Sequence, residues 1–323
     1  MVTGKPLRRW LLACTQIVVS ISLIVWIFLN LDFQNTLKLV ASTSILSFIF
    51  CMISLAVLVI PAAIRWRWFV GKFMPDGMAA PALGLAIRIN TVNIALNQFL
   101  PSTLGGDLYR VIIAKSFGLS LLRSTGATVA DRMSAFVILI LISGPALIMT
   151  LVSLRGIFWL PQMIISLAIM AVIGLCIFCW VFIHKYATKF ASAFTLFQSF
   201  LRSNGLISRV VFTSLTIQLV TLAVMIVTSK TLGIALGFFS LFGIMAASLV
   251  ASRLPISVAG WGVREGVLIG FLGANGVAAE KAFATSVIYG LAELAAAMLA
   301  LLITSVIPVL FRFFPTQSPS EHQ

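Results

Sequence analysis

The pattern of hydrophobic positions along the chain is that of a membrane protein with several crossings. A transmembrane helix needs about 20 consecutive apolar residues. Five uncharged runs meet that length, at Trp10–Leu29, Ala41–Ile64, Met133–Leu154, Gly156–Ile183 and Val210–Ser229. A sixth run, Ala282–Phe311, contains a single charged residue, Glu293. The pattern therefore predicts six spanning helices.

Two further segments are apolar but interrupted near their middle by proline, glycine and charged residues. They run from about Ala79 to Lys115 and from about Leu232 to Ala279. Irregular backbone is tolerated at membrane depth only where protein or a water-filled cavity shields it. We predict that each segment is a pair of half-helices that enters and leaves on one side. The alternative is two complete, tilted crossings for each segment, which gives eight spans.

Composition agrees with this fold class, an all-α polytopic membrane protein. Apolar residues make up 61% of the chain and charged residues 9%, whereas soluble domains carry about 25% charged residues. The first run exceeds the 7–15 residues of a signal-peptide core and lacks a cleavage site, so we expect it to remain as an anchor. The four cysteines all fall inside predicted spans. We therefore predict no metal site, no cofactor and no catalytic residue.

The distribution of the +14 net charge favours a topology over a nucleic-acid partner. Basic residues cluster after alternate spans, among them Arg65, Arg67 and Lys72 after the second. Under the positive-inside rule, both termini are then cytoplasmic. The remaining basic excess suits anionic lipid.

The two interruptions resemble each other. LPSTLGGDLYR begins at Leu100 and LPISVAGWGVR at Leu254, and their prolines, Pro101 and Pro255, lie about half the chain apart. Each half holds three spans and one broken segment, and an odd number of crossings inverts the second half relative to the first. We predict an inverted repeat of the kind found in secondary transporters. We divide the chain into a cytoplasmic N-terminus at 1–9, a first membrane repeat at 10–155, a second membrane repeat at 156–312 and a flexible C-terminal tail at 313–323.

The broken segments carry groups that suit an anionic ligand. Half-helix N-termini attract anions, glycines allow close backbone approach, and guanidinium groups match phosphate. The glycines are Gly105, Gly106, Gly260 and Gly262, and the arginines are Arg110, Arg253 and Arg264. The carboxylates Asp107, Asp131, Glu265 and Glu293 either hold the arginines or accept a proton or a cationic head group. The alternative is that Asp107–Arg110 and Asp131–Arg132 merely pair at the cytoplasmic interface.

Three stretches resemble the flippase-like family, whose region is shared with the transmembrane part of lysylphosphatidylglycerol synthases, the multiple peptide resistance factors. They are N-x-x-L-P-S-x-x-G-G-D-x-x-R from Asn97 to Arg110, Ala-Thr-Val-Ala-Asp-Arg at Ala127–Arg132, and L-P-I-S-x-x-G-W-G-x-R-E-G from Leu254 to Gly266. The resemblance covers almost the whole chain. Where the family commonly shows Glu-Arg, this chain has Asp131–Arg132.

The resemblance implies movement of lipids or lipid-linked head groups between the leaflets of a bacterial or archaeal inner membrane. The larger synthases also carry a soluble aminoacyl-transferase domain. Since this chain ends eleven residues after Arg312, we expect no lysyl transfer and no enzymatic activity.

We therefore predict a flippase-like transporter for an anionic phospholipid or a polyprenyl or other lipid-linked substrate, with homo-oligomerisation left open. The predicted substrate-binding residues are Asn97, Pro101, Gly105, Gly106, Asp107, Arg110, Asp131, Arg132, Arg253, Pro255, Gly260, Gly262, Arg264, Glu265 and Glu293. Three alternatives remain: a membrane-embedded transferase acting on a lipid carrier, a small-solute or ion transporter, and a non-catalytic assembly partner.

Overall fold

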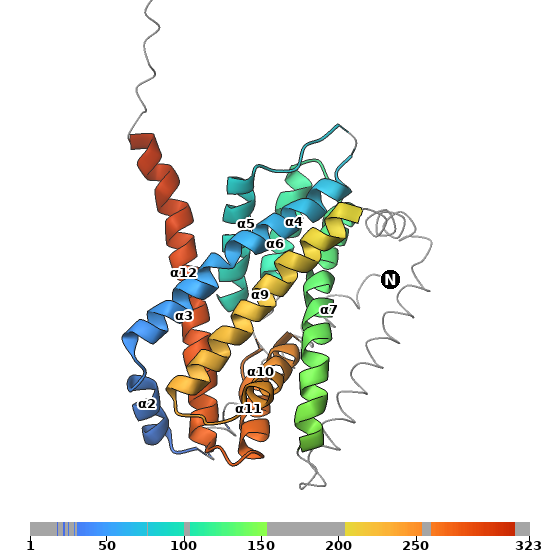
Figure 1. Cartoon of the computed structure of the whole chain (residues 1–323). Helices are drawn as coiled ribbons and strands as arrows, with labels where there is room; N and C mark the ends of the chain where they lie inside the picture. The colour runs from blue at the N-terminus through green and yellow to red at the C-terminus, as the bar shows by residue number, and fades with distance from the viewer. Residues whose placement is uncertain are drawn as a thin grey trace, which may run out of the picture.

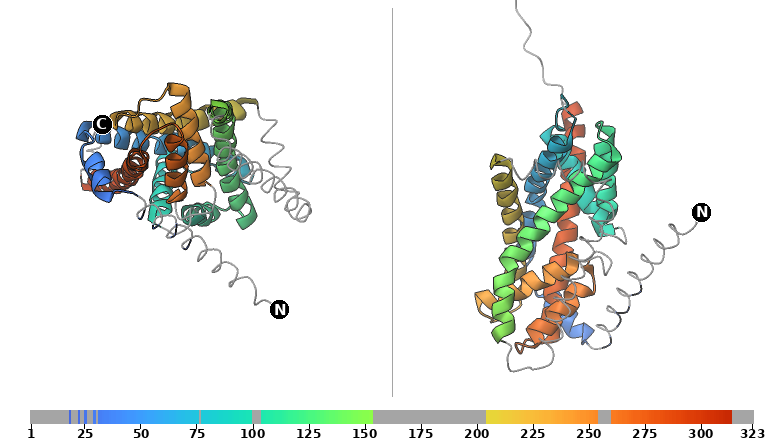
Figure 2. Two further views of the ribbon diagram at one scale, coloured as in Figure 1. Left: turned by 90° about the horizontal axis from the view of Figure 1, so that it is seen from below. Right: turned by 90° about the vertical axis from the view of Figure 1, so that its right-hand side faces the viewer.

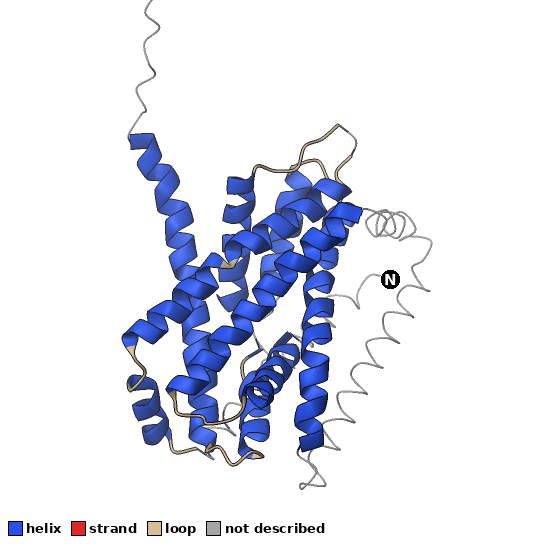
Figure 3. Ribbon diagram, viewed as in Figure 1, coloured by secondary structure: helices blue, strands red, loops and turns tan. Residues whose placement is uncertain are grey.

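The structure is a computed structural model that describes residues 31–75, 77–99, 104–153, 204–253 and 260–313, together with positions 18, 22, 25 and 29. Every regular element in these ranges is a helix (Figure 3). The predicted spans Trp10–Leu29 and Gly156–Ile183 lie outside the described residues, apart from four isolated positions in the first.

Ten helices fill the described ranges (Figure 1). They are α2 (Phe33–Ala41), α3 (Ile45–Val57), α4 (Val59–Phe73), α5 (Leu83–Phe99), α6 (Leu104–Ser116), α7 (Leu121–Ser153), α9 (Asn204–Thr231), α10 (Phe238–Arg253), α11 (Val263–Gly273) and α12 (Ala279–Phe313). Four stretches are long and apolar enough to cross a membrane: Ile45–Phe73, Leu121–Pro145, Gly205–Thr231 and Ala279–Thr304. Each overlaps a predicted span, so the multi-pass membrane character of the chain is confirmed.

The stretch Ile45–Phe73 is interrupted once, at Leu58, which separates α3 from α4. Pro61 explains the interruption, because its ring clashes with the carbonyl of the residue four positions earlier and offers no N–H. That earlier residue is Val57, the last residue of α3. The apolar run thus continues as a second helix, and α4 extends past the predicted end at Ile64 to Phe73.

Helix α2 was not predicted from the hydrophobic pattern. Asp32 caps its N-terminus, where the Asp32 carboxylate accepts a hydrogen bond from the Asn35 N–H at 3.1 Å. A side-chain oxygen at this position satisfies an N–H that has no partner within the helix. This short helix packs against α12 at the lower end of the molecule in Figure 1.

Helix α7 begins twelve residues before the predicted span, which started at Met133. Asp131 and Arg132, which directly precede the predicted span, lie inside this helix and inside the candidate span Leu121–Pro145. The helix continues through them because other helices supply partners for both charges.

The two predicted broken segments are both helix pairs, interrupted where the sequence indicated. Helices α5 and α6 flank residues 100–103, and α10 and α11 flank residues 254–259. Figures 1 and 2 show the first pair in the upper half of the molecule and the second in the lower half. At 1.5 Å per residue, α6 and α11 are about 20 and 17 Å long, against a hydrocarbon core of about 30 Å. Both helices are shorter than that core.

Two apolar cores lie above and below the middle of the bundle. The upper core includes Trp66, Phe69 and Phe73 of α4, and the lower one includes Met245 of α10 and Phe271 of α11. Arg110 of the first broken segment and Arg253 of the second belong to neither core and line the same cavity. We call the charged residues of the two broken segments, with the residues that pair with them, the polar layer.

Candidate functional site

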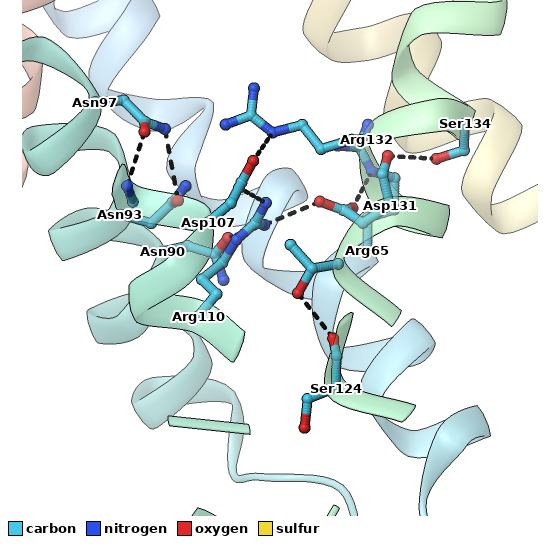
Figure 4. Close-up of polar contacts among 12 residues, drawn as sticks. Arg65, Asn90, Asn93, Asn97, Asp107, Arg110, Ser124, Asp131, Arg132 and Ser134 are labelled. Carbon is cyan, nitrogen blue, oxygen red and sulfur yellow. Dashed lines mark hydrogen bonds and ion pairs between the residues drawn. The ribbon is translucent and has the colours of Figure 1, made fainter. Parts of the chain in front are cut away.

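Five charged side chains form one continuous chain of ion pairs in the upper part of the polar layer (Figure 4). Its order is Arg65, Asp131, Arg110, Asp107, Arg132. Consecutive nitrogen–oxygen distances are 2.7, 2.9, 2.6 and 2.7 Å. Every carboxylate lies between two guanidinium groups. Three arginines and two aspartates give these five side chains a net charge of one positive charge.

Three helices bring these side chains together. Arg65 comes from α4, Asp107 and Arg110 from consecutive turns of α6, and Asp131 and Arg132 from α7. Neutral side chains complete the contacts, because Arg110 donates to the side-chain amide oxygen of Asn90 at 3.2 Å and Arg65 donates to the Ser214 hydroxyl at 3.0 Å.

Asp131 and Arg110 are buried, with 2% and 3% of their surfaces exposed. A buried charge that loses its partner costs several kcal/mol. The alternating order therefore fixes how α4, α6 and α7 pack.

Two expectations from the sequence are wrong at this point. Arg65 was grouped with the cytoplasmic border charges, yet it is buried and paired with Asp131. Asp131 and Arg132 were considered as a simple pair, but Asp131 binds Arg65 and Arg110 whereas Arg132 binds Asp107. Adjacent residues on a helix point about 100° apart, so each finds a partner on a different neighbour.

The tip of the first broken pair is held by a close approach between α5 and α6. The Gly106 N–H donates to the Asn97 side-chain oxygen at 3.0 Å. A Cβ atom at Gly106 would lie 2.2 Å from the Asn93 carbonyl oxygen, which is shorter than any real contact. Only glycine fits here. Gly105, beside it, is half-buried.

The second broken pair has its own charged cluster around Arg264. Its guanidinium donates to the Ser286 hydroxyl at 2.6 Å and the Glu265 carboxylate at 3.1 Å. Glu265 also accepts from the Gly262 N–H at 2.6 Å and from Ser286 at 2.5 Å. Glu293 lies farther away, 3.9 Å from the Arg264 guanidinium. The cluster ties the start of α11 to α12.

Aromatic rings and glycines shape the surroundings of Arg264. Its guanidinium lies over the rings of Trp261 and Tyr289, at 5.1 and 5.0 Å from their centroids. A Cβ atom at Gly290 would come within 2.8 Å of the guanidinium. The backbone reaches α11 through Gly260 and Gly262, with φ of 82° and 88°. These angles favour glycine, which has no Cβ to clash.

A cavity of about 620 Å³ lies between the two clusters. Ligand pockets in proteins are commonly about 300–1,000 Å³. Its polar lining residues are Arg65, Asn90, Thr91, Asn93, Asn97, Gln98, Arg110, Asp131, Arg132, Gln218, Thr221, Arg253, Tyr289 and Glu293. Its apolar lining residues are Leu55, Ala56, Leu58, Val59, Ala62, Ile94, Met133, Ala135, Phe136, Leu139, Ile217, Ala296, Ala297 and Ala300. Side chains from both halves of the chain thus meet in one amphipathic space.

The predicted site residues divide into two groups around this cavity. Those that line it are Asn97, Arg110, Asp131, Arg132, Arg253 and Glu293. Gly105, Gly106, Asp107, Gly260, Gly262, Arg264 and Glu265 are described but lie behind the wall, where they hold the lining residues or shape the helix pairs. Pro101 and Pro255 are outside the described residues.

Several residues of the site were missed by the sequence argument. Arg65, Asn90, Asn93, Ser286 and Tyr289 are the main ones. The asparagines carried a readable signal, because Asn90, Asn93 and Asn97 recur at helical spacing in an otherwise apolar segment. A polar stripe of this kind on a buried helix faces a cavity or another polar group. Ser286 and Tyr289 carried no such signal.

The metal-binding chemistry of the site is limited. Across the described ranges, no three His, Cys, Asp or Glu side chains gather in a way that would hold a metal ion. The carboxylates of the polar layer already contact guanidinium groups. The described side chains of the site can therefore bind a ligand through hydrogen bonds and ionic interactions.

A comparison with protein families decides where the chain belongs. The family described as Lysylphosphatidylglycerol synthase TM region matches residues 14–301. The chain belongs to this family. Both broken helix pairs and the cavity between them fall within the matched residues. Membership of the lysylphosphatidylglycerol synthase TM region family indicates a membrane protein of lipid metabolism or transport. No curated protein matches the chain.

Proposed function

We propose that the protein moves a phospholipid or a lipid-linked head group between the two leaflets of a membrane. The observation that carries this proposal is the amphipathic lining of the cavity. Arginines and amides line it together with aliphatic and aromatic side chains. An amphipathic ligand matches both kinds of side chain, with its head group near the polar ones and its acyl chains near the apolar ones.

The arrangement of the broken pairs supports a transport role over a static binding role. Paired broken helices at the centre of inverted repeats mark substrate sites in secondary transporters, which expose the site to alternate sides. Here α5–α6 lie in the upper half of the bundle and α10–α11 in the lower half (Figure 1), and residues of α5, α6 and α10 line the cavity. In our proposal, the two halves are inverted repeats, and each pair gates the cavity from its own side of the membrane.

The distribution of charge supports an orientation in the inner membrane. The ends of α4, α6, α7 and α9 in the upper half carry Lys72, Lys115, Arg123 and Arg209. At the lower end, Lys38, Lys230 and Lys281 are accompanied by Asp32 and Glu280. The positive-inside rule then places the upper end, with the C-terminus of α12, in the cytoplasm. We propose the same side for the N-terminus.

Translocation in vesicles of defined composition tests the proposal directly. Purified protein is reconstituted with a fluorescent phosphatidylglycerol, and dithionite is added outside to bleach the label that reaches the outer leaflet. We expect bleaching of inner-leaflet label in protein-containing vesicles at a rate well above that of protein-free vesicles. Equal rates would refute lipid movement.

Two further readouts in the same vesicles separate the alternatives. A transferase would change the mass of the recovered lipid, and a small-solute or ion transporter would release trapped solute or dissipate an ion gradient while the lipid stays in place. We expect the lipid mass to stay constant and the solute to stay trapped.

A further inference from the structure

Positive charges outnumber negative ones by one around the cavity, and Arg253 is the arginine among them that no described carboxylate contacts. Five arginines, Arg65, Arg110, Arg132, Arg253 and Arg264, stand with four carboxylates, Asp107, Asp131, Glu265 and Glu293. Each carboxylate contacts an arginine other than Arg253. The tips at 100–103 and 254–259 contain no charged residue that would alter this count. One positive charge is left.

Arg253 is placed to meet a ligand. It is the last residue of α10, its side chain is exposed, and it lines the cavity. Within the described chain, no ion pair or hydrogen bond reaches its guanidinium. Arg132 and Tyr289 line the same cavity, so Arg253 brings a charge from the second half of the protein to the space that the first charged chain borders.

Arg264, which the sequence suggested as a phosphate ligand, is differently placed. Its guanidinium is 3% exposed and is occupied by Ser286, Glu265 and two aromatic rings. Its Nε and Nη2 donate to Ser286 and Glu265, and its Nη1 lies 3.9 Å from Glu293. Arg264 is thus a positioning residue that holds α11 against α12, whereas no described residue engages the five donors of Arg253.

We infer that Arg253 is the head-group ligand of the cavity, and that the cavity takes a phosphate with one negative charge. This inference rests on the proposed lipid-transport function. A guanidinium pairs with phosphate through two parallel hydrogen bonds. A phosphodiester carries one negative charge, which the single excess cation neutralises. A phosphomonoester carries about 1.5–2 negative charges near neutral pH, and would leave uncompensated negative charge in a poorly hydrated space.

Binding of matched short-chain lipids to the full-length protein in detergent tests the inference. The probes are dihexanoyl phosphatidylglycerol, a phosphodiester; dihexanoyl phosphatidic acid, a phosphomonoester; and dihexanoyl glycerol, which has no phosphate. We expect the wild-type protein to bind the diester most tightly. Arg253→Gln should weaken diester binding by at least about tenfold, the loss of a charged hydrogen-bonding partner, and should leave dihexanoyl glycerol unchanged.

Two control variants make the result specific. Arg88→Gln removes the same charge from an exposed position of α5 that does not line the cavity, and should bind all three probes as the wild type does. Glu293→Gln removes one carboxylate from the cavity wall, so the excess rises to two positive charges. That variant should shift preference toward phosphatidic acid, which a merely structural role of Glu293 would not produce.

Clear outcomes overturn the inference. If Arg253→Gln binds the phosphodiester lipid with wild-type affinity, Arg253 is not the head-group ligand. If that variant loses affinity for dihexanoyl glycerol to the same extent, Arg253 supports the fold and does not bind the phosphate. Two results would refute the predicted charge stoichiometry. One is tighter binding of phosphatidic acid than of phosphatidylglycerol by the wild-type protein, and the other is an unchanged lipid preference in Glu293→Gln. The vesicle assay tests the proposed function separately. If the wild-type protein translocates lipid and Arg253→Gln binds the phosphodiester normally, only the inference about Arg253 is refuted. If the wild-type protein does not translocate lipid, the proposed function is refuted.

Discussion

Replacing Asp131 by asparagine should be among the most damaging isosteric changes in the protein. Asp131 is 2% exposed and accepts from Arg65 at 2.7 Å and from Arg110 at 2.9 Å. Asparagine keeps the volume but removes the charge, which leaves two buried guanidinium groups facing each other across a neutral amide.

The size of the effect follows from the geometry. Removing one partner from a buried ion pair costs about 3–5 kcal/mol. Asp131 binds two arginines, but contributions from contacts that share a residue do not simply add. Arg110 also keeps Asp107, at 2.6 Å. We therefore expect the free energy of unfolding to fall by about 3–5 kcal/mol in Asp131→Asn, with most of the loss arising at Arg65.

Equilibrium unfolding in mixed detergent–SDS micelles measures this change, and two variants control it. Asp32→Asn makes the same substitution at the exposed cap of α2, where asparagine caps about as well as aspartate, so stability should stay within about 0.5 kcal/mol. Arg65→Gln combined with Asp131→Asn removes the stranded cation and should be more stable than Asp131→Asn alone. A loss below about 1 kcal/mol in Asp131→Asn, or a double variant no more stable than the single one, would refute the assigned charge chain.

Three further predictions test the helix tips, the aspartates and the topology. Gly106→Ala should sharply reduce the yield of monodisperse protein on size-exclusion chromatography, because its Cβ would clash with the Asn93 carbonyl oxygen. Gly84→Ala is the control, since a Cβ there would meet nothing within 4 Å. Equal yields from the two variants would contradict the close approach of α5 and α6. Asp107→Asn should reduce the amount of co-purified lipid seen by native mass spectrometry, since Asp107 holds Arg110 and Arg132; unchanged lipid together with lost function would instead favour a catalytic base. In a cysteine-free background, a cysteine at Ala278 should react with an impermeant thiol reagent from outside intact cells, and one at Ser116 only after permeabilisation; external labelling at Ser116 would invert the proposed orientation.

The sequence was most informative where a residue has a local effect. Proline and paired glycines break helices through their own backbone chemistry, so each broken segment was predicted to hold two helices, as the structure shows. The kink at Leu58 follows from Pro61 in the same way, although it was not predicted. The apolar runs located four of the candidate spans because each helix carries its own hydrophobicity.

The partners of the charges were not predictable in this way. Arg65 and Asp131 are 66 residues apart, and only the packing of α4 against α7 brings them together. From sequence, Arg65 looked like a border charge because it directly follows an apolar run, and Asp131 looked like a partner of Arg132 because they are adjacent. The pairing of a buried charge is a property of the assembled bundle. The same reason hides Ser286 and Tyr289, which are ordinary residues until α11 packs against α12.

The chain of alternating ion pairs also has a consequence for membrane insertion during synthesis. Arg65 is synthesised long before Asp131, and an unpaired arginine at the centre of a spanning helix costs about 2.5–3.5 kcal/mol on insertion scales. Until α7 leaves the ribosome, α4 and α6 hold arginines for which Asp107 is the sole carboxylate of the chain of ion pairs. The upper half of the bundle therefore cannot settle helix by helix. It reaches its final depth in the bilayer as a unit, once the helix carrying Asp131 has been delivered.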